Sequence, residues 1–158
     1  MPTRTRTTGV IRSTDPAILQ RLKDAFHDGT GLFTSIIPPP PEFPALPDDY
    51  KRQWRLVHWS SLHDVVAHPD GGSRIRFIAP EALAFEIVTV WNMPDAFFNR
   101  LVEMGCEVVA ETDTETNGVE IFHDFYVNGR YSSLLVDEKP SGDHPEVTDD
   151  AVKQEEKT

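Results

Sequence analysis

The chain has 158 residues, of which 39% are hydrophobic, and it carries a formal net charge of −11. This size and composition allow one domain with an ordinary hydrophobic core. No stretch approaches the roughly 18 consecutive apolar residues of a membrane helix, and the first residues show no apolar run like that of a signal peptide. We therefore expect a soluble, cytoplasmic protein.

The negative charge lies in the second part of the chain. Residues 1–93 contain 10 Lys or Arg and 10 Asp or Glu, whereas residues 94–158 contain 5 and 16. Such a surface repels phosphate backbones, and the basic residues that stand together in sequence are Arg4, Arg6 and Arg12. We therefore expect no direct nucleic-acid binding. The acids either keep the protein soluble, or attract a basic partner protein that itself handles nucleic acid.

The first elements predicted along the chain are a strand and a helix. A basic leader over residues 1–8 precedes "TGVIRST", which alternates and is rich in β-branched residues, as a short strand is. In the next stretch Thr14 or Asp15 can cap a helix, Pro16 suits its first turn and Gly29 can end it.

A proline-rich crossing follows. The segment 38–47 contains six prolines, which exclude a central strand or a helix interior and predict an irregular path over the surface. Residues 50–59 place Trp54 and Val57 at helical spacing between charged residues, which favours a short helix.

The second part is richer in strands. The pieces "LHDVVAH" and "RIRFIAPEALAFEIVTVW" are strand-like and separated by the turn "HPDGGS". The clearest helix follows, with Asn92 as the expected cap, Pro94 in the first turn and Gly105 after the apolar stripe. Two strands, "EVVAETD" and "GVEIFHDFYVNGRY", are joined at "TNG", a hairpin signal. Beyond Leu135 the chain has 8 acids, 3 bases and no aromatic residue, which predicts a disordered tail.

This order of elements predicts an α+β fold. We expect a ferredoxin-like βαββαβ plait with an inserted proline-rich crossing and short helix, plus an extra C-terminal strand. The expected organisation is a flexible basic leader over 1–8, a single domain over 9–135 and an acidic disordered tail over 136–158. Antiparallel pairing with both helices on one face would leave the other face to be covered by the crossing or by a partner.

Several motifs, spread along the chain, resemble motifs of the YubB ferredoxin-like family of phage- and plasmid-encoded proteins. The stretch "HWSSLHD" is similar to the family's Asn-Trp-Gly-Thr-Lys-Trp-Asp: Trp59 and Asp64 match, whereas His58, Ser60, Leu62 and His63 depart. "TVWNMP" is similar to a strand ending that reads Thr-Ala-Trp-Ser-Pro-Pro. The matching residues there are Thr89, Trp91 and Pro94. In "LFTSIIPPPPEF" the residues matching the family's Phe and Ile-Pro-Met-Pro stretch are Phe33, Ile37, Pro38 and Pro40.

The resemblance covers about residues 9–131 and ends near the Asn-Gly turn of "FYVNGRY". It implies a ferredoxin-like topology without an iron–sulfur cluster, because one cysteine cannot hold a cluster of the usual kind. It also implies an accessory role in a mobile element, and it transfers no catalytic residue.

The stretch "VHWSSLHDVV" places Ser60, Ser61, His63 and Asp64 together. A catalytic triad needs side chains that converge from separate elements, and neighbours on a strand point to opposite faces. No G-x-S-x-G elbow accompanies them. We therefore interpret the stretch as scaffold, with Trp59 as a core anchor and Asp64 fixing the loop through hydrogen bonds.

Metal and cofactor sites are not expected. His58, His63, His68 and Asp70, with His123 and Asp124 later in the chain, have neither helical nor strand spacing for one metal. Cys106 has no partner at ligand spacing and should be a small buried side chain.

The candidate binding residues are aromatic and acidic. Trp59 and Trp91 favour core packing over ligand stacking, whereas an exposed Trp54 beside Tyr50 could anchor a partner. The acids that run from the second helix into the next strand either form a solvated face or contact a basic partner; they are Glu103, Glu107, Glu111, Asp113 and Glu115.

The sequence thus favours a non-enzymatic accessory protein that binds another protein, such as a host defence or nucleic-acid-handling component. Two alternatives stay open. One is an enzyme or small-ligand binder that uses the sheet face with His58, His63 and His123, and the other is a structural homodimer packed through its sheets.

Overall fold

The computed structural model describes residues 4–68, 72–90, 92–116 and 120–138. In chain order the elements are β1 (Arg4–Arg12), α1 (Pro16–Asp28), the short 3-10 helix η1 (Phe43–Ala45), α2 (Asp48–Trp59), β2 (Arg74–Ala79), β3 (Ala82–Val90), α3 (Asp95–Glu103), β4 (Glu107–Thr116), β5 (Glu120–Val127) and β6 (Arg130–Glu138). The expected mixed α+β class is confirmed.

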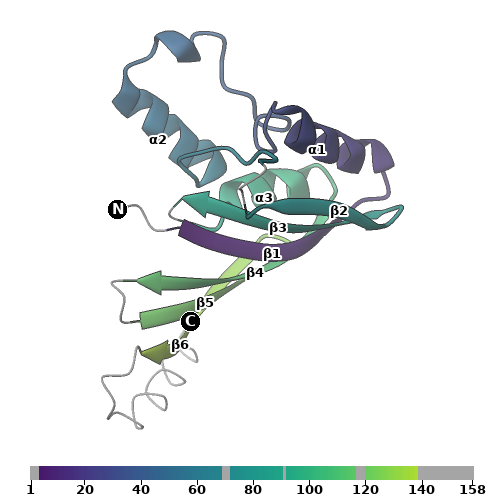
Figure 1. Cartoon of the computed structure of the whole chain (residues 1–158), viewed down its shortest axis with the longest axis vertical. Helices are drawn as coiled ribbons and strands as arrows, with labels where there is room; N and C mark the ends of the chain where they lie inside the picture. The colour runs from purple at the N-terminus through teal and green to yellow at the C-terminus, as the bar shows by residue number, and fades with distance from the viewer. Residues whose placement is uncertain (1–3, 69–71, 91, 117–119, 139–158) are drawn as a thin grey trace.

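All six strands form one open antiparallel sheet in the order β2-β3-β1-β4-β5-β6. β1 is central, because it pairs with β3 on one side and with β4 on the other. Figure 1 shows α1, α2 and α3 on one side of the sheet, with β5 and β6 extending away from them. The sheet therefore has an inner face toward the helices and an open face that no helix in the described ranges covers.

The core lies between the helices and the inner face. Burial alternates along β3, so that Leu83, Phe85 and Ile87 point inward. They belong to one apolar cluster with residues of α1 and α3. Each fully buried Leu or Phe side chain in such a cluster contributes about 1.5–3 kcal/mol to the free energy of folding. The helical members are Leu19, Leu22 and Phe26 of α1 and Phe97, Phe98 and Leu101 of α3.

β1 begins earlier than the sequence predicted. Residues 4–8, expected in a flexible leader, are half of the central strand. The stretch looked like a polar leader because the inward positions carry Thr5 and Thr7, both 0% exposed, in place of aliphatic residues. Threonine suits a strand because its β-branched side chain packs well on a pleated surface.

The segment 62–68 was expected as a strand and is irregular. Its backbone forms isolated hydrogen bonds with two other segments and not the regular bonds of a strand. Leu32 N–H donates to the Val65 carbonyl, and Ala67 N–H donates to the Phe26 carbonyl, both at 2.8 Å. Of the apolar "VV" pair, Val65 is buried beside the end of α1 and Val66 is exposed, an alternation that local sequence does not distinguish from a strand.

The last strand, β6, was not predicted as a separate element and extends past the expected domain limit at 135. It follows a two-residue turn in which Asn128 and Gly129 have φ values of 47° and 100°. Asn-Gly favours such a turn because both central positions need positive φ. The "TNG" turn that was expected between the preceding strands falls partly in 117–119, outside the described residues.

α3 begins at Asp95, after the buried Pro94, so the expected cap Asn92 lies outside the helix. The cap comes from a distant residue: Ser60 Oγ accepts a hydrogen bond from Ala96 N–H at 3.2 Å. The end of α2 thereby positions the start of α3.

Candidate functional site on the open face of the sheet

The stretch "VHWSSLHDVV" has a structural role. It ends α2 and continues irregularly, so its polar residues do not lie on a strand as expected. Ser60, with a left-handed φ of 59°, caps α3, and Ser61 Oγ donates to the His63 carbonyl at 2.9 Å. Both serine hydroxyls that could serve as the nucleophile of a Ser-His-Asp triad are therefore engaged with backbone groups.

Asp64 holds the loop after α1 against the segment after α2. Its carboxylate accepts hydrogen bonds from the N–H groups of Phe33 (2.7 Å), Thr34 (2.9 Å) and Val65 (2.7 Å), and from the Thr34 hydroxyl (2.6 Å). Gly31 approaches closely, since a Cβ there would lie 2.2 Å from Asp64 Oδ2. These bonds agree with the expected loop-fixing role of Asp64.

The tryptophans pack inward. Trp59 is 3% exposed, and its Nε1 donates to the Ile37 carbonyl at 3.0 Å, as expected of a core anchor. Trp54 was expected to be exposed but is half-buried: its ring stacks on His58 at a centroid distance of 4.3 Å and meets Trp59 edge-on. Tyr50 is exposed on α2, so the structure does not join it to an exposed Trp54 anchor. Trp91 lies outside the described residues.

The histidines do not converge. His58 belongs to α2, where its Nδ1 lies 2.9 Å from the Trp54 carbonyl oxygen; His63 is exposed in the following segment, and His123 lies on β5. Within the described ranges, no group of three or more His, Cys, Asp or Glu could hold a metal ion. Asp70 is outside those ranges. Cys106 is buried, as expected, and burial raises the pKa of its thiol.

The open face carries five arginines from β1 and β2, and Arg130 of β6 lies on the same face, because it pairs in register with Val127. Arg4, Arg6 and Arg12 alternate on β1 with inward-facing residues, and Arg74 and Arg76 are exposed on β2. Between the two strands, β3 supplies Glu86 to the same face. Its Oε2 forms an ion pair with Arg6, and its Oε1 lies 3.6 Å from Arg74 Nη2.

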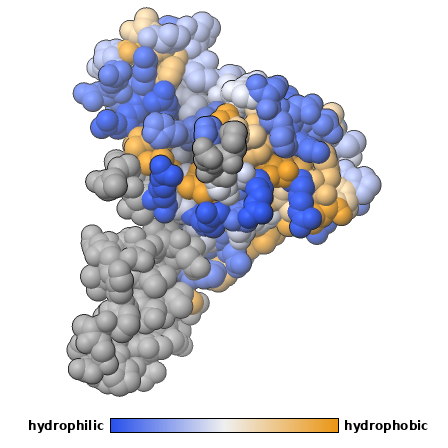
Figure 2. Space-filling model, viewed as in Figure 1, coloured by the Kyte–Doolittle hydropathy of each residue, from blue (hydrophilic) through white to orange (hydrophobic). Residues whose placement is uncertain are grey.

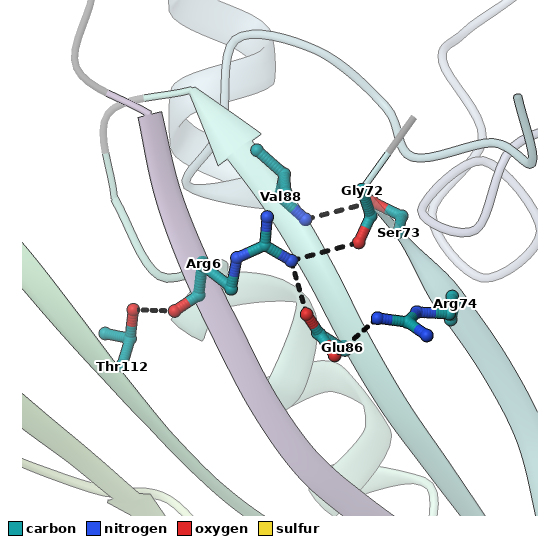
Figure 3. A network of polar contacts seen from close by, with 7 residues as sticks. All are labelled: Arg6, Gly72, Ser73, Arg74, Glu86, Val88 and Thr112. Carbon is teal, nitrogen blue, oxygen red and sulfur yellow. Dashed lines mark hydrogen bonds and ion pairs between the residues drawn. The ribbon is translucent and has the colours of Figure 1, made fainter. Parts of the chain in front are cut away.

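Two of these arginines, Arg6 and Arg74, belong to a network of polar contacts that Figure 3 shows. Arg6 Nη1 also donates to the Gly72 carbonyl at 3.1 Å, and Val88 N–H donates to Ser73 Oγ at 3.0 Å. Only the three arginines of β1 could be grouped from the sequence. Arg74 and Arg76 of β2 join them because β3 pairs with both strands. The structure corrects the expected charge layout: a positive patch lies on a strongly acidic chain.

An apolar hollow lies beside this patch. Val109, Phe125 and Val127 are 50%, 37% and 47% exposed, and with Val10 they line a hollow of about 380 Å³. A second hollow of about 460 Å³ lies over Ala84 between the arginines of β2. Over β1, β2 and β3, hydrophilic and hydrophobic residues lie side by side in Figure 2. The open face is thus wide, partly apolar and shallowly hollowed.

The acidic candidates are only partly brought together. Glu107 and Glu111 are exposed on β4, where Glu107 pairs in register with Arg12 and Glu111 Oε2 lies 3.4 Å from His123 Nε2. Glu103 is on α3, 3.7 Å from Arg100. Asp113 and Glu115 lie on β4, but the structure does not describe their side chains. Among the side chains that the structure describes, two of the predicted acids, Glu107 and Glu111, lie beside β1.

No protein-family model matches this chain, and neither a curated protein nor a solved structure matches it significantly. Among the residues that the structure describes, no helix is long and apolar enough to cross a membrane.

Proposed function

We propose that this chain is a non-enzymatic binding module that recognises a partner protein on the open face of its sheet. The observation that carries the proposal is the composition of that face. Arginines on β1 and β2 lie on one half, Glu107 and Glu111 on the other, and exposed Val109, Phe125 and Val127 adjoin them. Apolar residues surrounded by charges of both signs are typical of protein interfaces.

A protein suits this face better than a nucleic acid does. Glu86 already neutralises part of the charge of Arg6 and Arg74, and Glu107 and Glu111 would repel a phosphate backbone laid across β4. A protein partner can present a carboxylate to one half and a basic group to the other, which favours one orientation of binding.

The fold and biological setting are part of the proposal. The order β2-β3-β1-β4 with a helix after β1 and another after β3 supports a ferredoxin-like plait, to which β5 and β6 add an edge. The resemblance to the YubB family supports an accessory role in a phage or plasmid, acting on a host defence or nucleic-acid-handling protein in the cytoplasm.

The test is affinity capture with matched charge reversals. Arg76→Glu and Glu111→Lys change the open face, whereas Arg21→Glu on α1 and Glu103→Lys on α3 make the same charge changes on the helical side. We expect the first two variants to capture at least tenfold less partner from host lysate than the wild type does. The second two should capture as much as the wild type. Equal capture by all four folded variants would reject the open face as the binding surface.

A further inference from the structure

The open face has a self-complementary layout. Glu107, Val109 and Glu111 of β4 pair in register with Arg12, Val10 and Thr8 of β1. A two-fold axis that runs parallel to the strands, between β1 and β4, would lay β4 of one chain over β1 of another. Val10 would then face Val109 of the second copy, and Arg12 would face its Glu107. Such an isologous contact uses the same patch on both chains.

The next strands outward, β3 and β5, fit the same operation, whereas the outermost pair, β2 and β6, would place Arg76 opposite Arg130. β3 of one chain would face β5 of the other, because each is the next strand outward from the β1–β4 pair. Ala84 pairs with Val10 and Val127 pairs with Val109, so the operation places Val127 over the hollow above Ala84. A small residue in a hollow thus meets an exposed apolar residue.

The area of the face is sufficient. The six strands have 6 to 10 residues each, and at a spacing of about 4.8 Å and a rise of about 3.3 Å per residue they cover roughly 800 Å². Two such faces bury roughly 1,600 Å², within the range of about 1,200–2,000 Å² that stable protein interfaces use. Sheets packed in this way lie about 10 Å apart, with strand directions about 30° from parallel.

We propose that the partner of the open face is a second copy of this chain, and that the protein is a two-fold symmetric dimer packed sheet to sheet. This inference rests on the proposed function, since it uses the same face for binding; a host partner would have to displace the second copy. The polar contacts between copies join Arg12 to Glu107, twice, around an apolar centre of Val10 and Val109.

The experiment is size-exclusion chromatography with light scattering at 5–100 µM, on the full chain. We expect a mass of twice 17.8 kDa for the wild type. Arg12→Glu and Glu107→Arg should each weaken self-association at least tenfold, because each places like charges together twice. An equimolar mixture of these two variants should form heterodimers, since both pairs again have opposite charges. The double variant R12E/E107R should dimerise like the wild type.

Thermal unfolding controls for folding, and Val109→Gln replaces either charge variant that fails to unfold cooperatively. A wild type that is monomeric at 100 µM overturns the dimer, and so does a dimer that none of these variants affects. If the wild type is monomeric while Arg76→Glu still loses partner capture, only this inference fails. If neither self-association nor capture responds to changes on the open face, the proposed function fails as well.

Discussion

Asp64 shows how one side chain can organise two segments that are distant in sequence. Its carboxylate accepts backbone N–H groups from both sides of the proline-rich crossing. We predict that Asp64→Ala lowers the free energy of unfolding by about 3 kcal/mol, because it leaves several partly buried N–H groups without an acceptor. Urea denaturation measures the change, and Asp49→Ala on the exposed first turn of α2 should cost less than about 0.5 kcal/mol. Equal losses in the two variants would contradict the role of Asp64.

Tyr126 makes the stability of the fold depend on pH in alkaline solution. Its hydroxyl donates to Asn99 Oδ1 at 2.6 Å, and burial raises its pKa to about 12. An unfolded tyrosine has a pKa of about 10. Between these values the unfolded chain loses a proton that the folded chain retains, so stability is full below pH 10 and falls from pH 10 to 12.

Tyr126→Phe should cost about 1 kcal/mol at pH 7 and should flatten the fall in stability above pH 10. The measurement is the free energy of unfolding from pH 7 to 12 in both proteins. Tyr131, whose pKa burial also raises, is present in both, so the difference isolates Tyr126. An unchanged alkaline slope in the variant would refute the assignment.

At the scale of elements, Ser60 joins two helices. It ends α2 in a left-handed conformation and caps α3 through its hydroxyl. Ser60→Ala should cost about 1–1.5 kcal/mol, because it removes the cap and keeps the unfavourable backbone conformation. Ser60→Gly loses the same hydroxyl but relieves the backbone, so it should cost less. Thermal unfolding compares the two, and a larger loss for glycine would show that the left-handed conformation of residue 60 is not a source of strain.

The elements also show what local sequence reveals. α1 was predictable because Asp15, Pro16 and Gly29 give start and stop signals within one stretch. β6 was missed although Asn128-Gly129 is a local hairpin signal, whereas the segment 62–68 was not predictable, because its conformation depends on the end of α1. The expected cap of α3 failed for the same reason, since the residue that caps the helix comes from α2.

At the scale of the whole molecule, the candidate site shows the same limit. The acids of β4 could be named from sequence, but strand pairing, which no local pattern specifies, places Arg74 and Arg76 beside the arginines of β1. The face predicted to be acidic thus carries both positive and negative residues. Trp59 and Asp64 were assigned to scaffold on a strand geometry that the stretch does not have, and their distant partners lie before the proline-rich crossing.

The position of β1 yields the last prediction, which concerns the integrity of the whole fold. Removing residues 1–8, the expected leader, deletes half of a strand that pairs with both β3 and β4. It also removes Thr5 and Thr7 from the inner face, so the sheet would lose its connection between the β2–β3 and β4–β6 halves. We expect the truncated chain to lose cooperative unfolding in circular dichroism. Removing residues 139–158, which are most of the expected acidic tail over 136–158, should shift the melting temperature by only a few degrees, because tails of such composition contribute few packed contacts. A truncation at residue 8 that unfolds cooperatively near the wild-type temperature would show that β1 does not hold the two halves together.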